Sequence, residues 1–166
     1  GRTPRTVPVE AVITNADTGG TVIRAFAVAH DRRWTGFMTF MAVYFTLDET
    51  PVFGSDLSAW VDVEITAEGL PPVTAHDYLV TGGRPGFESV IPLWDRIDFL
   101  MDNPYRPVGI RGIKFRITVK GGRDVRIIER AHADRQRVPP GGTVNITLDL
   151  RPFRGPVVRE NLPVVL

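Results

Sequence analysis

The feature that most constrains this chain is the alternation of apolar and polar residues in two segments of its second half. Residues 113–120 place Ile, Phe, Ile and Val on one side and Lys, Arg, Thr and Lys on the other. Residues 143–150 repeat the pattern, with one apolar face made by Val144, Ile146, Leu148 and Leu150. A period of two is typical of a strand with one buried face. With residues 124–132 between them, these segments predict three antiparallel strands at the centre of the fold.

The Gly-Gly pair after the first segment predicts a hairpin in one particular register. A two-residue loop would set the lysine face of one strand beside apolar residues of the next, and a slip of one residue reverses every side chain. A three-residue loop, 121–123, instead pairs Val119 with Val125, which favours an odd-length turn with a glycine bulge. This register places Glu129 on the core side, where we expect a structural ion pair with an arginine rather than a catalytic acid.

Basic residues gather in the second half of the chain. Residues 1–104 hold 7 basic and 14 acidic side chains, a net charge of −7, whereas residues 105–166 hold 13 and 5, a net charge of +8. In the predicted hairpin four cations share the outer face and could attract an anionic polymer: Lys114, Arg116, Arg126 and Arg130. Two other interpretations stay open, in which acidic elements of the first half cover the basic strands or copies of the chain meet head to tail. No aromatic residue alternates with these cations, so nucleic acid is a disfavoured partner.

Length and composition indicate one globular domain, or one domain with a small appendage. The 166 residues, 43% hydrophobic and 23% charged, argue against disorder and predict a single β-rich domain over 1–166. There is no cysteine, which excludes a disulfide framework and a thiolate metal site. Neither a signal peptide nor an apolar run long enough to span a membrane is present. The abrupt ends of the chain predict a piece excised from a longer protein.

The first half predicts strands and helices in alternation. Residues 6–14 and 21–29 flank a turn-rich segment and form a hairpin, in which Pro8 lies at a sheet edge or near the start of its strand. Residues 57–67 alternate and pair with a strand over 73–81. Helices are predicted over about 35–47 and 89–103. The fold class is therefore α+β and mostly β, with antiparallel β-sandwich-like sheets and two helices.

The segment 34–47 is the most apolar in the chain, and its propensities also permit a strand. As a helix it is apolar nearly all round and too short to span a bilayer, so it is buried on more than one side. Thr35 is a possible N-cap. Its aromatic residues belong either to the core or to an interface with a partner domain or a second copy in a homodimer: Trp34, Phe37, Phe40 and Tyr44.

No group of residues matches a catalytic, cofactor-binding or metal-binding motif. The histidines are scattered, no serine lies in a nucleophile elbow, and no glycine pair belongs to a phosphate loop. The aspartates on one side of the second predicted helix lack a loop that wraps an ion, so we expect a solvated face or partners for arginines: Asp95, Asp98 and Asp102. We predict that the chain is not an enzyme and holds no cofactor or metal.

Four short segments resemble a known family: Arg5-Thr-Val-Pro-Val9, Glu129-Arg-Ala131, Pro140-Gly-Gly-Thr-Val144 and Leu150-Arg-Pro-Phe-Arg-Gly155. They are similar to the β-rich region that follows the peptidase core in bacterial proteins of the SpoIVB-type serine peptidase family. The resemblance implies a non-catalytic accessory domain of an extracytoplasmic peptidase-like protein, secreted or in the cell envelope, that works through protein contacts. It carries over no catalytic residue, and it favours the helix at 35–47.

Two alternatives to an accessory domain follow from the residues. One is a module that binds an anionic polymer through the basic hairpin face, for which affinity would depend on salt. The other is an independent hydrolase, which requires a pocket where a histidine meets a carboxylate. The histidines available for such a pocket are His30, His76 and His132.

Overall fold

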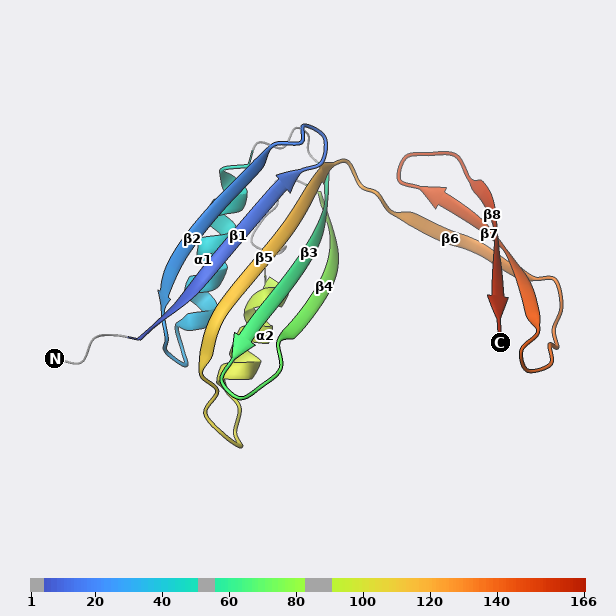
Figure 1. Ribbon diagram of the computed structural model, residues 1–166. Coiled ribbons are helices and arrows are strands. Elements are labelled where there is room, and N and C mark those ends of the chain that lie inside the picture. Colours follow the sequence, from blue (N-terminus) through green and yellow to red (C-terminus); the bar gives the residue numbers. More distant parts are fainter. Residues whose placement is uncertain (1–4, 51–55, 83–90) are drawn as a thin grey trace. The chain divides into compact units, whose positions relative to one another are not determined.

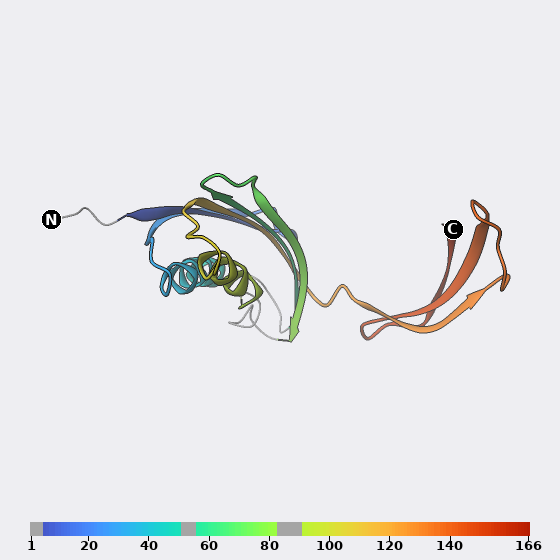
Figure 2. The same cartoon turned by 90° about the horizontal axis from the view of Figure 1, so that it is seen from below.

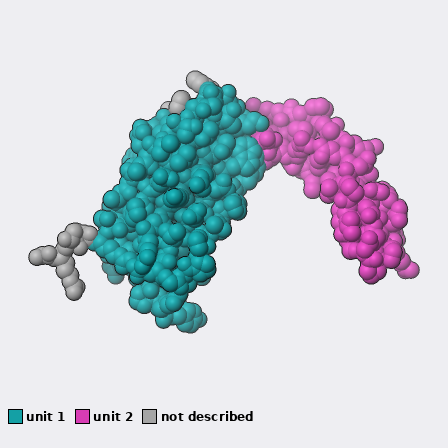
Figure 3. All heavy atoms as spheres, in the orientation of Figure 1, with its two compact units in different colours: residues 1–122 teal, residues 123–166 magenta. Residues whose placement is uncertain are grey.

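The computed structural model describes residues 5–50, 56–82 and 91–166. The chain divides into two compact units, Gly1–Gly122 and Arg123–Leu166, where the sequence predicted one domain (Figure 3). The described part of the first unit holds a five-stranded sheet and two helices, and the second holds a three-stranded sheet. The predicted fold class, α+β and mostly β with two helices and two sheets, is confirmed.

The five-stranded sheet is built from two hairpins and a central strand (Figure 1). One hairpin joins β1 (Thr6–Asn15) to β2 (Thr21–Ala29), and the other joins β3 (Asp56–Ala67) to β4 (Val73–Gly82), so both predicted hairpins are confirmed. Strand β5 (Ile110–Gly121) lies between them, and the order is β2-β1-β5-β3-β4. Neighbouring strands are antiparallel except β1 and β5, which are parallel.

Pro8 lies near the start of an interior strand, which is one of the two positions predicted for it. Strand β1 has β2 on one side and β5 on the other. Its pairing with β5 begins only at Val9. The missing amide of Pro8 therefore leaves the ladder between β1 and β5 intact.

Both helices cover the same face of this sheet (Figure 2). Helix α1 (Thr35–Asp48) confirms the helical prediction for this segment over the strand alternative. Helix α2 (Ile91–Met101) confirms the second helix, and its predicted first residues, 89 and 90, lie outside the described residues. Neither described helix is long and apolar enough to cross a lipid bilayer.

Thr35 anchors α1 instead of capping it, because Trp34 occupies the N-cap and makes no side-chain cap bond. The Thr35 hydroxyl lies 2.9 Å from the carbonyl oxygen of Ala29 and 2.7 Å from that of Asp31. It also accepts a hydrogen bond from the Asp31 amide at 2.8 Å. These bonds fix the start of α1 to the end of β2, and Thr35 is fully buried.

The core of the first unit lies between the helices and the sheet. The inward residues of β3 and β5 predicted from alternation are all buried: Ala59, Val61, Val63, Ile65, Ile113, Phe115, Ile117 and Val119. Helix α1 contributes Phe40, Val43 and Leu47 to this core, and α2 contributes Ile97 and Met101. The opposite face of the sheet keeps the polar half of each alternating strand, as in a sheet with one covered side.

The predicted hairpin at residues 121–123 is wrong. Strand β5 pairs with β1 and β3, so both of its edges are occupied and none is left for residues 124–132. The amide of Gly121 donates to Asp17 Oδ2 at 2.7 Å, and that of Gly122 donates to the carbonyl of Asp56 at 2.8 Å. Gly122 has φ +86°, a left-handed conformation that glycine adopts easily, and there the chain leaves the sheet.

The second unit is a separate antiparallel sheet in the order β6-β7-β8. Its strands are β6 (Arg126–Ala133), β7 (Thr143–Pro152) and β8 (Val158–Val165). The predicted second and third strands are therefore neighbours, and the third strand of this sheet is β8, which pairs with β7, instead of β5. Pro163 belongs to β8, which is an edge strand and tolerates a residue without an amide proton.

Candidate interaction surfaces

Lys114 and Arg116 lie on the uncovered face of the five-stranded sheet, among acidic neighbours. Lys114 stands between Glu10 on β1 and Glu64 on β3 in the register of the sheet. Arg116 stands beside Asp62 on β3. The register therefore sets these two cations beside acidic residues of the first half, an arrangement compatible with the interpretation in which acidic elements cover the basic strands.

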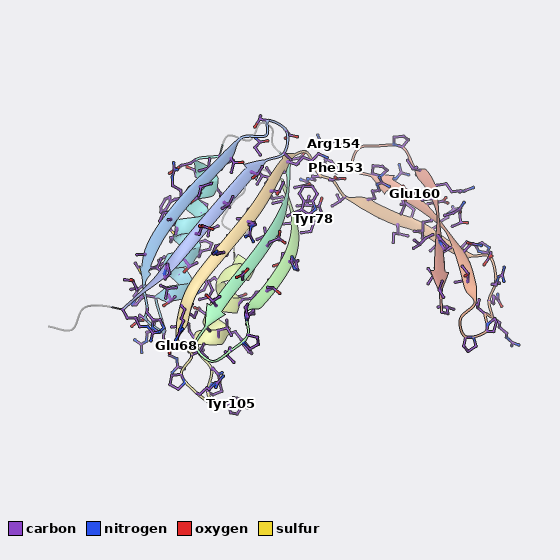
Figure 4. All side chains as sticks on the ribbon, viewed as in Figure 1. Glu68, Tyr78, Tyr105, Phe153, Arg154 and Glu160 are labelled. Atoms are coloured by element: carbon purple, nitrogen blue, oxygen red, sulfur yellow. The ribbon has the colours of Figure 1, made fainter. Side chains whose placement is uncertain are left out.

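Arg126 and Arg130 belong to the other sheet, on β6. Arg126 forms an ion pair with Glu160 of β8 (Figure 4). Arg130 lies opposite Asp149 of β7, whose pKa is lowered first by a hydrogen bond from Arg159 and last by the charge of Arg130. The predicted face of four cations does not form, because β5 and β6 do not pair.

His76 is the histidine that meets a carboxylate, and it does so in solvent. Its Nδ1 lies 2.5 Å from Asp62 Oδ1, and the two side chains are 77% and 54% exposed. Two residues along the same face, the ring of Tyr78, labelled in Figure 4, lies 5.1 Å from that of Trp60. Ser58 of β3 is fully buried and donates its hydroxyl to the carbonyl of Gly122. The pair therefore has neither the excluded solvent nor the oriented nucleophile of a catalytic dyad.

The other two histidines lie apart from this pair. His132 is exposed on β6 and His30 is half-buried after β2. No group of three metal-binding side chains gathers within residues 5–50, 56–82 and 91–166.

The three aspartates of α2 have different environments. Asp102 forms an ion pair with Arg32, whose hydrogen bond lowers the Asp102 pKa, so the predicted arginine partner is found here. Asp98 is half-buried against α1, and this burial raises its pKa. A Cβ atom at Gly36 would lie 2.2 Å from Asp98 Oδ1, so the glycine lets the two helices approach closely.

Glu129 has the predicted arginine partner but not the predicted burial. Its carboxylate forms an ion pair with Arg151 of β7, and Glu129 is exposed. The register between β6 and β7 shifts between Ile128 and Arg130, which is a β-bulge at Glu129. The extra residue changes the side to which the strand turns its side chains, a shift that the alternation alone could not reveal.

The aromatic residues predicted as an interface fall on different sides of α1. Phe40 is 1% exposed and belongs to the core, so it is not available to a partner. Phe37 and Tyr44 are half-buried, with rings 6.4 and 6.3 Å from that of Phe40. Trp34 is 56% exposed and stays on the outer side. The spacing of 37, 40 and 44 therefore marks the side that α1 turns toward the core and α2.

The outer side of α1 carries apolar residues that the sequence analysis missed. Met38 and Phe45 are 41% and 55% exposed, and Met41 is half-buried between them. Together with Trp34 they form one row along the helix, the outer α1 stripe: Trp34, Met38, Met41 and Phe45. Their separation by four, three and four residues was visible in the sequence, because this spacing keeps side chains on one helical face.

The sheet of the second unit has one polar and one apolar face. The polar face carries ion pairs of Arg159 with Asp149 and of Arg151 with Glu129. The other, the open β6–β8 face, is formed by side chains that share one side of the register: Ile128, Ala131, Ala133, Val144, Ile146, Leu148, Leu150, Val158, Leu162 and Val164. Within residues 123–166, all of them described, only Val144 and Leu150 are buried.

Comparison of the chain with protein-family models, with curated proteins and with solved structures finds no match.

Proposed function

We propose that the chain is a non-catalytic interaction module that binds another protein domain through the open β6–β8 face. The observation that supports this is the exposure of large apolar side chains on a single face: Ile128 is 61% exposed, Leu162 49% and Val158 43%. The principal contacts of each strand in this unit are with the other strands of the same sheet. A contiguous apolar face left in water is typical of a contact surface, since covering it is favourable.

A protein surface fits this face better than a membrane does. Peripheral membrane binding combines an apolar face with cations that meet anionic head groups. The cation on the open β6–β8 face is Arg126, and its charge is offset by Glu160 on the same face. An apolar surface of another protein domain needs no such cations.

The resemblance to the region that follows the peptidase core in SpoIVB-type proteins supports the proposal that this module belongs to a larger protein. In that context it is an accessory domain of an extracytoplasmic bacterial protein, and its partner is another domain of the same polypeptide or a separate protein. In this proposal the module acts by contact with its partner, and no residue of the chain is assigned a catalytic step.

Two adjacent isoleucines provide a matched test of the proposed contact. Ile127 and Ile128 are 67% and 61% exposed, yet Ile127 lies on the polar face, opposite Arg151, and Ile128 lies opposite Leu150. We would replace each in turn with the photo-crosslinking residue p-benzoylphenylalanine, in cells that express the full-length protein. We expect a crosslinked protein partner from position 128 but not from position 127. The crosslink should be lost when Leu162→Lys is added.

Three outcomes would overturn the proposal. These are crosslinks of equal yield from both positions, no crosslink from either, or a crosslink that Leu162→Lys leaves unchanged. Circular dichroism of each variant would show whether the sheet content is retained. Binding to heparin or DNA at low salt that survives Leu162→Lys would favour the polyanion alternative instead.

A further inference from the structure

Helix α1 presents an apolar surface to solvent where a surface helix normally carries charge. No charged residue occurs between Thr35 and Leu47. The buried side of α1 faces the core through Phe40, Val43 and Leu47, and the principal contacts of α1 with described elements are with α2, β1 and β2. The outer α1 stripe lies on the opposite side of the helix. A helix that is apolar on both sides is expected to be buried on both, so the outer side of α1 should also be covered by another layer.

The outer α1 stripe is complementary to itself. Its spacing of four, three and four residues reads the same in both directions along the helix. A two-fold axis perpendicular to α1, between residues 39 and 40, would set Trp34 against Phe45 of a second copy and Met38 against its Met41. An isologous contact needs a surface that matches itself under such an axis. Spacing of this kind is also the pattern of helices that pack side by side.

The charges at the two ends of α1 favour the antiparallel direction. Asp31, Arg32 and Arg33 precede the helix, where Arg32 forms an ion pair with Asp102. Asp48 and Glu49 lie at its end, where Glu49 forms an ion pair with Arg24. The first turn has no acidic residue and the last turn has no basic one. This order opposes the helix dipole, whose N-terminus favours anions and whose C-terminus favours cations.

An antiparallel second copy would reverse this unfavourable arrangement. It would bring the arginines of each copy to the acidic C-terminal end of the other, where cations are favoured. A parallel copy would instead set like charges together. Met and aromatic side chains suit such a contact, since they supply a large adaptable area.

We propose that the chain forms a homodimer in which α1 packs antiparallel against α1 of a second copy through the outer α1 stripe. Helix α1 is about 21 Å long at 1.5 Å per residue, so the contact is short and self-association falls in the micromolar range. The inference does not rest on the proposed function, because the stripe lies in the other unit.

Charge reversal gives a test that a folding defect cannot mimic. In the proposed dimer Arg33 of each copy faces the Asp48 end of the other, so Arg33→Glu alone and Asp48→Arg alone each create two repulsive contacts. An equimolar mixture of these two variants restores two attractive contacts. Sedimentation equilibrium at low salt should show wild-type dimers, each single variant weakened at least about tenfold, and recovery in the mixture. Arg137→Glu, in an exposed loop, is the control for the change in charge.

A second pair of variants tests the apolar part of the contact. Met38→Glu adds a charge to the outer α1 stripe, whereas Ile23→Glu adds one to the uncovered face of the sheet, where Ile23 is 60% exposed. We expect Met38→Glu to abolish dimerisation and Ile23→Glu to preserve it. Circular dichroism of both variants controls for folding.

Several results would overturn the homodimer. One is a monomer at every accessible concentration. Another is a dimer whose association constant is unchanged by both charge reversals or by Met38→Glu. A third is a mixture that associates no better than its components. Dimers that Ile128→Lys abolishes and Met38→Glu does not would show that the copies meet through the open β6–β8 face.

Discussion

The two sheets of this chain have similar alternating strands but opposite surroundings. In the first unit the apolar face of β1, β3 and β5 is covered by α1 and α2, and its central residues are almost fully buried. In the second unit the corresponding face of β6, β7 and β8 has no described helix against it. The alternation of apolar and polar residues along a strand creates an apolar face. That face becomes a buried core only where a second layer packs against it.

The difference has an energetic consequence. Apolar area removed from water contributes about 25 cal/mol per Å². Phe115 and Ile117 in β5 gain nearly all of this contribution, whereas Ile128 and Leu162 gain little in the described chain. The first unit therefore gains much more stability from apolar burial than the second unit does.

The largest expected effect comes from the covered sheet. Phe115 is 1% exposed at the centre of β5, so Phe115→Ala should lower the free energy of unfolding by about 3–5 kcal/mol. Ile128→Ala on the open face should change it by less than about 0.5 kcal/mol. Urea unfolding followed by tryptophan fluorescence measures the first unit, because Trp34, Trp60 and Trp94 all lie there, and hydrogen exchange of the β6–β8 amides in urea measures the second unit. Similar losses in both variants would contradict the comparison.

A smaller effect should come from the bonds that hold the covering helix to the sheet. Thr35→Val removes a buried hydroxyl that bonds to the backbone at Ala29 and Asp31, and it should cost about 1–3 kcal/mol in the same unfolding experiment. The matched control is Thr74→Val, on the exposed edge strand β4, which should cost under about 0.5 kcal/mol. Equal losses in the free energy of unfolding for Thr35→Val and Thr74→Val would mean that the hydrogen bonds of Thr35 do not stabilise the packing of α1 on the sheet.

The third effect is a gain in stability where the helices pack together. Burial raises the Asp98 pKa, so the folded state binds this proton more tightly than the unfolded state does. Stability is therefore lost as pH rises through the raised pKa, and the cost is fully present at neutral pH. Asp98→Asn should raise the melting temperature at pH 7 but not in acid below the ordinary aspartate pKa, whereas Asp95→Asn on the exposed side should have little effect at either pH. A gain of the same size at both pH values would contradict this explanation.

Residue patterns predicted the parts of the fold that depend on neighbours in the sequence. The two hairpins of the first sheet, both helices and the inward residues of β3 and β5 follow from local period and turn chemistry. The partner of β5 did not, because the choice between β1 and the next strand depends on pairing across about a hundred residues, which no local pattern encodes.

The interaction surfaces were harder to predict, since they depend on register and rotation. Glu129, predicted to face the core, lies with Ile127 on the polar face, and the helical rotation that buries Phe40 leaves Phe45 outside. A partner arginine for Glu129 was correctly expected from the cost of an unpaired carboxylate, although the side of the sheet was wrong. Spacing of the outer α1 stripe was present in the sequence, but only the position of the core shows which helical face is outside.

The smallest effect tests whether the polar face of the second unit contributes to its stability. Arg159 lowers the Asp149 pKa through a hydrogen bond, so the contribution of the pair is present above the ordinary aspartate pKa and is lost as pH falls through the lowered value. Arg159 is largely exposed, so solvent screening keeps the contribution of the pair small. We expect Arg159→Gln and Asp149→Asn each to speed hydrogen exchange of the β7 and β8 amides at neutral pH, with coupling between them in a double-mutant cycle. After correction for intrinsic exchange the coupling should disappear in acid. Coupling that persists there, or that exceeds the effect of Phe115→Ala, would mean that this sheet is held by its charges rather than by what covers its apolar face.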